Sequence, residues 1–579
     1  MPVFAFHCPY IPVNEIYILL LSAGASDSMH CCKEPACGLL LSILFSFREL
    51  VVDKKVLNHP FTVALYCLIL TVGVYLLFSP WERCGFFFDD ANFALGAQSF
   101  SLIDTRPHLP GYILHIMLIR LFRLFTGSAF SAMTLLSALY SGLAMEIFFL
   151  LLRKWADRKD ALVIVLFTVT NPVVWFYGCS TEIYSFDLFF SITLVYLGLS
   201  ARWIYILPVF AALGAGIRPS SAILLFPLYV YLWYAHYKGH AMSWKKCLLA
   251  HGVGLVAAIG WLYPLLRSAG GVRRFLALYK THDPMDPLTV PQNLYRFISF
   301  NYTTGISLAV VLGMTVLFSK RGEKKHDAQA GNRKGQYLLV VKLLLFWMIP
   351  PLLLFLFYAY SKGYILLLSC GISCVAFILL RRYTCRRKLL IILAILQSVY
   401  FIFTPYISPD IDSYLGRRFR KKGVAAIWFD RIRAVYLMGQ SRYRYLEKVD
   451  MLVSAIATAI KHNTDDPFYK KEYLLIDPTC PVLVRSLQVK HPHVHFAGLD
   501  VYDSTRFFSY NALSFANETG GIRRLLQSCL IFGRTDVITR FDLGPLIKRK
   551  DYGEFSLYYY TGEAFSQGAV PHETLFQRY

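Results

Sequence analysis

Long apolar runs alternate with short polar connections from residue 61 to residue 404. A helix that crosses the hydrocarbon core of a bilayer, about 30 Å thick, needs about 20 apolar residues. About eleven runs approach that length. They cover residues 61–80, 128–152, 161–177, 183–200, 203–217, 220–237, 248–266, 306–318, 337–358, 364–380 and 389–404. The pattern predicts an α-helical polytopic membrane protein with about eleven transmembrane helices.

Basic residues gather in every second connection between these runs. The basic connections hold Lys54 and Lys55, residues 153–159, Arg202, and residues 238–246, 320–334 and 381–388. By the positive-inside rule they face the cytoplasm, so the other connections face the opposite side. The outward segments are residues 81–127, the turns at Cys179 and Arg218, residues 268–302, residues 361–363 and everything after Tyr406.

The composition agrees with this assignment and narrows the classes of function. The chain carries 59 Lys and Arg against 36 Asp and Glu, a formal charge of +23, yet 56% of its 579 residues are hydrophobic and 16% are charged. In a soluble domain about a quarter of the residues are charged, so this composition excludes a disordered chain and argues against a soluble enzyme. Because the basic residues lie between apolar runs, the charge orients helices and does not indicate a nucleic-acid partner.

The two ends of the chain differ from its apolar middle. Residues 1–59 form either a leader or an interfacial segment, and the spacing of Cys31, Cys32 and Cys37 lacks the paired pattern of a metal site. Residues 60–406 form the transmembrane domain, which is expected to be catalytic. Residues 407–579 are expected to form a soluble domain on the non-cytoplasmic side.

The C-terminal domain is predicted to be a small α/β domain. Its expected strands are residues 473–476, 482–487, 494–498 and 538–543. No phosphate-binding Gly-rich loop and no nucleophile motif occurs in it, so we expect binding or support from it and no chemistry. A disulfide between Cys480 and Cys529 is permitted on that side of the membrane.

The first outward loop begins with two adjacent carboxylates, Asp89 and Asp90. Like charges side by side cost free energy unless another group uses them, so one of the two is a candidate general base. On a helix that begins here, Asp89 shares a face with Asn92 and Phe93, whereas Asp90 points about 100° away. Alternatively, Asp89 caps the helix N-terminus.

The same loop continues into a proline-rich turn and then an apolar stretch. Residues 107–111 cannot form regular helix, because each Pro biases its predecessor away from the α region. His108 in this turn binds a phosphate or orients an acceptor, and the alternative is a solvated loop histidine. Residues 113–125 carry Arg120 and Arg123 one helical turn apart, which predicts a basic amphipathic helix that lies in the headgroup layer and attracts lipid phosphates.

Three more ionisable residues lie at outward ends of the expected spans: Glu182, Arg218 and Lys362. Such residues at membrane depth are functional candidates, and the alternative is that each side chain snorkels to the interface. Together with Asp89, Asp90 and His108 they describe a carboxylate base that faces a cationic cradle. This combination suits a donor whose leaving group is a lipid phosphate.

Cofactors leave little trace in the sequence. His282, Asp283 and Asp286 could bind a divalent metal, but Asp-Pro repeats are common turn formers and we favour the turn. No cofactor is therefore expected to be required, with a divalent metal as the alternative.

Several motifs of the transmembrane domain resemble one superfamily. They are Asp89-Asp90, Pro107-His108-x-Pro110-Gly111-Tyr112, Asn171-Pro172-x-x-Trp175-Phe176-Tyr177, Gly216-Ile217-Arg218-x-Ser220, Phe226-Pro227-Leu228 and Lys362-Gly363-Tyr364-Ile365-Leu366. The set is similar to the GT-C superfamily, whose members are polytopic glycosyltransferases that use polyprenyl-phosphate sugars. Protein O-mannosyltransferases and the aminoarabinose transferase of lipid A are examples, and the later motifs resemble mainly uncharacterised bacterial members. The resemblance covers residues 61–404 and implies a GT-C-like fold.

The resemblance also implies roles for individual residues. The catalytic aspartate of the family falls on Asp89, and Asp90 takes the place where other members often have Glu, so both stay candidates for the base. The implied reaction is an inverting displacement, with an acceptor hydroxyl or amine attacking the anomeric carbon of the sugar. The implied substrate-binding residues are His108, Tyr112, Glu182, Arg218 and Lys362. The implied partners are a polyprenyl-phosphate sugar donor, a lipid, glycan or protein acceptor, and the membrane.

Two other classes of function stay open. A transporter or lipid-binding protein would use the same outward charges as a substrate path, but the internal repeats with broken helices that mark transporters are not seen. A noncatalytic scaffold would depend on the C-terminal domain. The membrane is either the bacterial inner membrane or the endoplasmic reticulum, and the sequons at Asn301 and Asn517 do not decide between them.

Overall fold

The computed structural model describes most of the apolar middle of the chain and the strands of its C-terminal part. The described residues are 60–77, 79, 88–103, 106–239, 243–281, 341–354, 362–380, 386–403, 451, 472–477, 487, 489, 495–500, 507–509, 530–534, 546–552 and 555–560. The chain forms two compact units, residues 1–77 and residues 78–579. In the first unit the structure describes helix α5, Pro60–Leu77.

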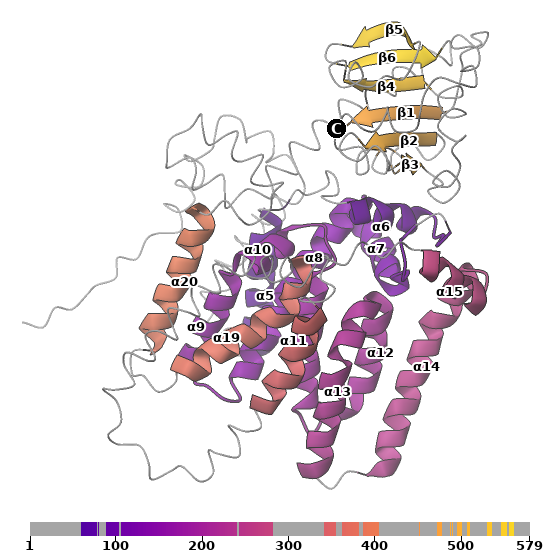
Figure 1. Ribbon diagram of the computed structural model, residues 1–579. Helices are drawn as coiled ribbons and strands as arrows, with labels where there is room; N and C mark the ends of the chain where they lie inside the picture. Colours follow the sequence, from indigo (N-terminus) through magenta and orange to yellow (C-terminus); the bar gives the residue numbers. More distant parts are fainter. Residues whose placement is uncertain are drawn as a thin grey trace, which may run out of the picture. The chain divides into compact units, whose positions relative to one another are not determined.

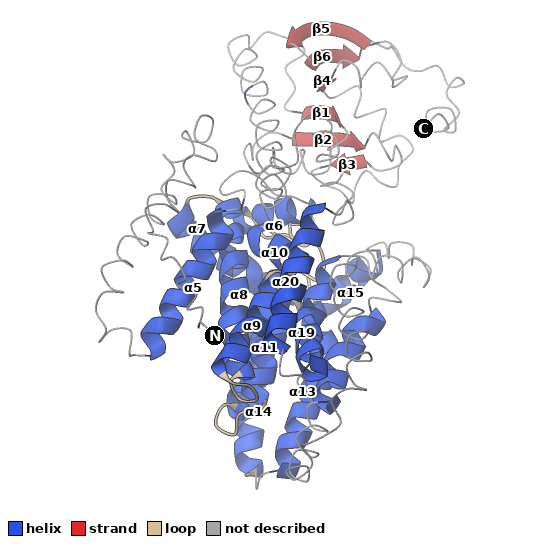
Figure 2. Cartoon of the chain, turned by 90° about the vertical axis from the view of Figure 1, so that its left-hand side faces the viewer, coloured by secondary structure: helices blue, strands red, loops and turns tan. Residues whose placement is uncertain are grey.

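The second unit contains a bundle of helices. They are α6 Phe88–Gln98, α7 Ile113–Thr126, α8 Ala129–Leu152, α9 Arg158–Val169, α10 Pro172–Cys179, α11 Ser185–Gly198, η2 Ile204–Ile206, α12 Leu207–Ile217, α13 Pro219–Gly239, α14 Trp244–Ser268, α15 Val272–Thr281, the helix Val341–Leu354, η4 Lys362–Ile365, α19 Leu366–Leu380 and α20 Arg386–Phe403. Helices α6 and α7 lie across one end of this bundle (Figure 1). The described helices and strands occupy separate parts of the chain (Figure 2).

Some of these helices have the length and composition of a membrane span. Within the described residues, α8 and α14 are long and apolar enough to cross a bilayer, and α9 with α10 makes a third if the bent pair counts as one span. The expected spans 183–200, 203–217 and 364–380 correspond to shorter apolar helices, and the expected span 306–318 lies outside the described residues. The number of about eleven spans therefore stays a prediction.

The expected continuous span over residues 161–177 is broken. Helix α9 ends at Val169, α10 begins at Pro172, and the two helices are bent by 73°. Pro172 has no N–H to continue the ladder of helical hydrogen bonds. The side chain of Asn171 accepts a hydrogen bond of 2.9 Å from the Val173 N–H, which begins the new helix.

A cluster of charged side chains joins the first turns of α9 and α20. Asp160 accepts hydrogen bonds from Arg386 at 2.8 Å and from Arg387 at 2.5 Å, one on each carboxylate oxygen. Asp157 pairs with Arg387 and also accepts a hydrogen bond of 2.9 Å from the Asp160 N–H, so it caps α9. The cluster links two connections that the charge pattern places on the same side of the membrane.

The C-terminal part holds a six-stranded sheet in the order β3-β2-β1-β4-β6-β5. The strands are β1 Glu472–Asp477, β2 His495–Asp500, β3 Phe507–Ser509, β4 Leu530–Arg534, β5 Leu546–Tyr552 and β6 Phe555–Tyr560. Strand β1 runs parallel to β2 and β4, and the other neighbours are antiparallel.

Two of these strands lie where the sequence pattern expects strands. β1 contains the expected strand 473–476, and β2 overlaps the expected strand 494–498. The expected strand 538–543 lies outside the described residues, as does 482–487 apart from Leu487, which is helical. The α/β class of this domain and its side of the membrane stay predictions.

Candidate functional site

The two adjacent carboxylates lie in the first turn of α6 but in different surroundings. The side chain of Asp89 is 43% exposed, whereas Asp90 is completely buried. The first turn of a helix presents free N–H groups and a positive dipole end, which favour acidic side chains. Asp89 is thus accessible to another molecule, and Asp90 is enclosed by the protein.

His108 lies against Asp89. Nδ1 of His108 is 3.3 Å from Oδ1 of Asp89. The turn that carries His108 contains cis peptide bonds before Pro107 and Pro110, and the Gly111 N–H donates a hydrogen bond of 3.0 Å to the His108 carbonyl within it. The structure therefore brings the predicted turn histidine to the predicted carboxylate.

An aromatic cluster surrounds Phe93, one helical turn after Asp89. The ring centroid of Phe93 is 5.4 Å from that of His108, 5.1 Å from Tyr112 and 5.1 Å from His115. Tyr112 is buried, has a left-handed backbone with φ of 42°, and precedes α7. Burial raises the pKa of the Tyr112 hydroxyl above its usual range, so this hydroxyl keeps its proton.

Asp90 and Glu182 meet on the buried side of α6. The hydroxyl of Thr181 donates a hydrogen bond to Oδ2 of Asp90, and the backbone carbonyl of Glu182 accepts one of 2.8 Å from Ser137. Burial, and then the charges of Asp90 and Asp89, raise the pKa of the Glu182 carboxyl well above its usual range. The Glu182 carboxyl therefore holds a proton more readily than an exposed carboxyl does.

Arg218 is a buried cation at the end of α12. Arg218 is 2% exposed, and its backbone N–H donates a hydrogen bond of 2.8 Å to the Gly214 carbonyl. Nε lies 3.0 Å from Oδ1 of Asp187. Cζ of Arg218 lies 4.0 Å from the ring centroid of Tyr184 and 5.2 Å from that of Tyr364. The predicted cation is thus held by one carboxylate and two aromatic rings.

Asp187 is a site residue that the sequence analysis missed. It lies in the first turn of α11, is completely buried, and accepts a hydrogen bond from the hydroxyl of Ser221 as well as the contact from Arg218. An acidic residue inside an apolar run was the available signal. Asp187 is a single acidic residue in the expected span 183–200, so the apolar pattern of the run conceals it.

Lys362 begins η4, and its side chain lies outside what the structure describes. The next two residues pack against Tyr184. A β-carbon placed on Gly363 would lie 2.0 Å from Cγ of Tyr184, and the ring centroids of Tyr184 and Tyr364 are 5.7 Å apart. The backbone of this segment is therefore part of the Arg218 cluster, while the role of Lys362 stays a prediction.

Helix α7 has the expected amphipathic character, but Arg120 differs from the expectation. Its guanidinium donates hydrogen bonds of 3.0 Å to the carbonyls of Gly96 and Ala97 at the end of α6. Arg120 caps α6 because the last carbonyls of a helix lack intrahelical partners. Both arginines expected to attract lipid phosphates are exposed, and that expectation stays a prediction.

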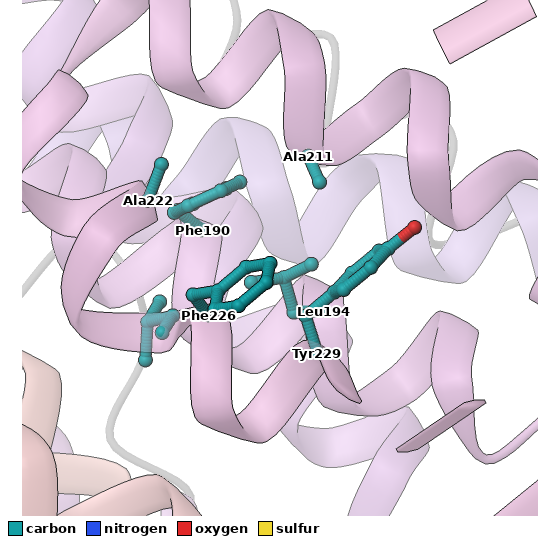
Figure 3. A pocket seen from close by; sticks show the side chains of 7 residues that line it. Phe190, Leu194, Ala211, Ala222, Phe226 and Tyr229 are labelled. Atoms are coloured by element: carbon teal, nitrogen blue, oxygen red, sulfur yellow. The ribbon is translucent and has the colours of Figure 1, made fainter. Parts of the chain in front are cut away.

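An apolar cavity of about 200 Å³ lies between α11, α12 and α13. Its lining side chains are Phe190, Leu194, Ala211, Ala222, Leu225, Phe226 and Tyr229. The hydroxyl of Tyr229 is directed away from the other lining residues (Figure 3) and lies 2.9 Å from Nε2 of His251. The cavity therefore offers apolar surface and little polar chemistry.

The metal and modification sites weighed from the sequence fall largely outside the described residues. This holds for Cys31, Cys32, Cys37, His282, Asp283, Asp286, Asn301, Cys480, Asn517 and Cys529. Within the described residues, no group of three or more His, Cys, Asp or Glu side chains has an arrangement that could hold a metal ion.

Comparison with known proteins identifies the fold. No protein-family model matches the chain, and no curated protein matches it in sequence. A crystal structure of ArnT from Cupriavidus metallidurans bound to undecaprenyl phosphate is similar, with a TM-score of 0.55 and 11% identity over 86% of this chain and 98% of that one. The apo structure of the same protein gives a TM-score of 0.55 and 12% identity over 85% and 97%.

The chain therefore shares the fold of these ArnT structures, which confirms the fold that the resemblance predicted. At this level of identity the likeness concerns the fold. Together with the long apolar helices, it identifies the chain as an integral membrane protein.

Proposed function

We propose that the protein is a membrane glycosyltransferase that moves a sugar from a polyprenyl-phosphate donor to an acceptor on the non-cytoplasmic face, with inversion. The observation that carries the proposal is the buried guanidinium of Arg218, which contacts Asp187 and two tyrosines and whose charge acts on Tyr112 and Glu182 together with that of an accessible carboxylate, Asp89. The ArnT-like fold supports it, because that protein was crystallised with undecaprenyl phosphate.

Arg218 binds the leaving group in this proposal. Arginine presents a planar fork of N–H groups that matches a phosphate, and its charge stabilises the negative charge that develops as the phosphate departs. A buried position strengthens this effect because water does not screen it. Lys362 and His108 are proposed to assist, as their positions at η4 and beside Asp89 allow.

Asp89 is the preferred base. It is accessible and adjacent to His108, whereas Asp90 is buried and accepts a hydrogen bond from Thr181. The acceptor O–H or N–H gives its proton to the Asp89 carboxylate as its lone pair forms the bond to the anomeric carbon. The bond from that carbon to the phosphate oxygen breaks, and its electron pair leaves with the polyprenyl phosphate.

The apolar cavity has a suitable position for the first isoprene units of the donor. Phe190 follows Asp187 by three residues on α11, and Ala222 follows Arg218 by four, so both lining residues lie about one helical turn, or about 5 Å, from the ion pair. A phosphate at Arg218 would then leave its apolar chain next to an apolar surface.

The direct test uses purified protein in lipid nanodiscs with a panel of radiolabelled polyprenyl-phosphate sugars, with and without a membrane extract as a source of acceptor. Release of polyprenyl phosphate is measured. We expect one donor to be consumed, and Asp89→Asn to lower the rate by about 100- to 10,000-fold, the range for loss of a general base.

Asp157→Asn is the matched control, because Asp157 is a half-exposed carboxylate at the first turn of α9. It should keep the wild-type rate. A fully active Asp89→Asn variant would exclude Asp89 as the base, and Asp90→Asn then tests the other carboxylate. If no donor is consumed under any condition, the transporter or lipid-binding alternative replaces the enzyme.

A further inference from the structure

We infer that Asp187 is a positioning residue that fixes the guanidinium of Arg218 edge-on, so that its two terminal nitrogens face the donor phosphate. The inference rests on the proposed function, because it concerns how the phosphate is bound. It adds a residue to the site that neither the motifs nor the resemblance includes.

The contact with Asp187 holds one edge of the guanidinium. Nε of Arg218 lies 3.0 Å from Oδ1 of Asp187, with the side chains 2% and 0% exposed. The same oxygen accepts the hydroxyl of Ser221, so the carboxylate is itself held in place by α13. Because the guanidinium is rigid and planar, fixing Nε leaves it free to turn only about one axis.

Two tyrosine rings restrict that remaining rotation. Cζ of Arg218 lies 4.0 Å from the centroid of Tyr184 and 5.2 Å from that of Tyr364. Gly363 allows the close approach, since a β-carbon there would lie 2.0 Å from Cγ of Tyr184. The two ring centroids are 5.7 Å apart, so both rings lie on one side of the guanidinium, and Nη1 and Nη2 form the edge that Asp187 does not contact.

The terminal nitrogens of Arg218 make no hydrogen bond or ion pair with any residue that the structure describes. Nε is the fully buried donor of Arg218 without a hydrogen-bond partner there, whereas the terminal nitrogens are not fully buried, so a ligand can reach them. Two parallel N–H groups match two oxygens of a phosphate.

Asp187 also lacks the full set of contacts of a structural carboxylate. Its Oδ2 is buried and has no hydrogen-bond partner in the described part of the chain. A residue that served only to fill the core would be expected to use both oxygens. Only Oδ1 of Asp187 has contacts, and these are with Arg218 and Ser221. We therefore attribute to Asp187 the role of holding Arg218 in the ligand site.

The test is a double-mutant cycle on binding of undecaprenyl phosphate to the full chain in nanodiscs. The variants are Asp187→Asn, Arg218→Ala and the double variant, and Asp187→Asn keeps the shape of the side chain. If Asp187 acts through Arg218, Asp187→Asn weakens binding by about tenfold in the wild type, within the range for coupled neighbours. In the Arg218→Ala background it weakens binding no further.

The steady-state kinetics of the same variants add a second readout. Asp187→Asn is expected to raise KM for the donor and lower kcat together, because the phosphate is held less well both in the ground state and as it departs. The matched control is Thr193→Val, which removes another buried polar group from α11 and should leave binding within about twofold. Equal losses from Asp187→Asn in both backgrounds would overturn the inference.

A second substitution protects the test against misfolding. Asp187→Glu keeps the charge but moves the carboxylate by one methylene, and it is carried through the same cycle with the same expectation. Wild-type binding of undecaprenyl phosphate is measured first. If the wild type does not bind it, the proposed function fails; if the wild type binds it and the losses are additive, only the positioning role fails.

Discussion

Two arginine–aspartate clusters occur in this molecule, one at the starts of α9 and α20 and one between α11 and α12. In the first, each oxygen of Asp160 accepts a hydrogen bond from a different arginine, Arg386 or Arg387. In the second, Oδ1 of Asp187 accepts the Ser221 hydroxyl and lies 3.0 Å from Nε of Arg218, while Oδ2 of Asp187 and Nε of Arg218 have no hydrogen-bond partner in the described residues.

The difference separates a structural ion pair from a binding site. The Asp160 carboxylate has both oxygens used and nothing left for a ligand, and the arginines around it are 27% and 39% exposed, which lowers the cost of desolvation. The Arg218 pair is almost fully buried and incompletely used. Burial of an unsatisfied pair costs free energy, so we interpret it as a site that a ligand completes.

The strongest way to break this comparison is to remove one arginine from each cluster. Arg218→Ala should lower sugar transfer by about 100- to 1,000-fold, as loss of a group that stabilises transition-state charge does. Arg386→Ala should leave the rate per folded molecule within about twofold, because its partners are structural. Release of polyprenyl phosphate measures both. Equal losses in the two variants, with both folded, would contradict the distinction.

The next effect concerns stability. Asp160→Asn should lower the free energy of unfolding by about 1–3 kcal/mol, because three charge-assisted hydrogen bonds weaken at a carboxylate that is 4% exposed. The rate of transfer per folded molecule should not change. Thermal unfolding followed by tryptophan fluorescence measures the first quantity. A variant with normal stability and no sugar transfer would show that Asp160 belongs to a functional site and is not a structural residue.

The third effect depends on pH and concerns His115, which the sequence analysis did not single out. Burial, and then the charge of Arg218, lower its pKa from 6.5 to about 3, so the folded state keeps it neutral. The unfolded state binds a proton below pH 6.5 and the folded state does not. Stability is thus complete above pH 6.5 and falls by about 1.4 kcal/mol per pH unit below it.

His115→Phe removes the titrating group, so its thermal unfolding should vary less between pH 7 and pH 5 than that of the wild type. An unchanged pH dependence would show that the imidazole does not stay neutral in the folded protein.

The smallest effect distinguishes the exposed pair of Arg387 and Asp157 from the buried carboxylate of Asp160 in the same cluster. Arg387→Ala should lower the unfolding temperature less than Asp160→Asn does, because the Arg387 and Asp157 side chains are 39% and 50% exposed. Salt screens such exposed pairs, so the difference from wild type should shrink in about 1 M NaCl, where the Debye length is about 3 Å. A difference that does not change with salt would indicate lost packing instead.

The charge pattern of the sequence predicts which residues of the candidate site lie near one another. It placed Asp89, Asp90, His108, Glu182 and Arg218 on one side of the membrane, and the structure brings these residues into one cluster. The reason is general: when spans are antiparallel neighbours, residues at the same end of several spans must lie near one another.

The sequence does not predict which side chain of the cluster contacts which other group. The partner of Arg218 lies inside an apolar run, where Asp187 looks like part of a span. Arg120 has the spacing of a lipid-facing arginine, and yet the free carbonyls of α6 bind it. Likewise, the break at Asn171 depends on a cap that competes with a continuous helix. These outcomes depend on packing between distant segments, which local pattern does not contain.

The contact between Gly363 and Tyr184 limits how homologous sequences can diverge. Because a β-carbon at position 363 would lie 2.0 Å from the ring, a mutation there is tolerated only after residue 184 has become smaller. The order of the two mutations matters, since the reverse order passes through an inactive protein with its ring pushed away from Arg218. Among homologues, glycine at 363 and an aromatic residue at 184 should therefore be inherited together or lost together.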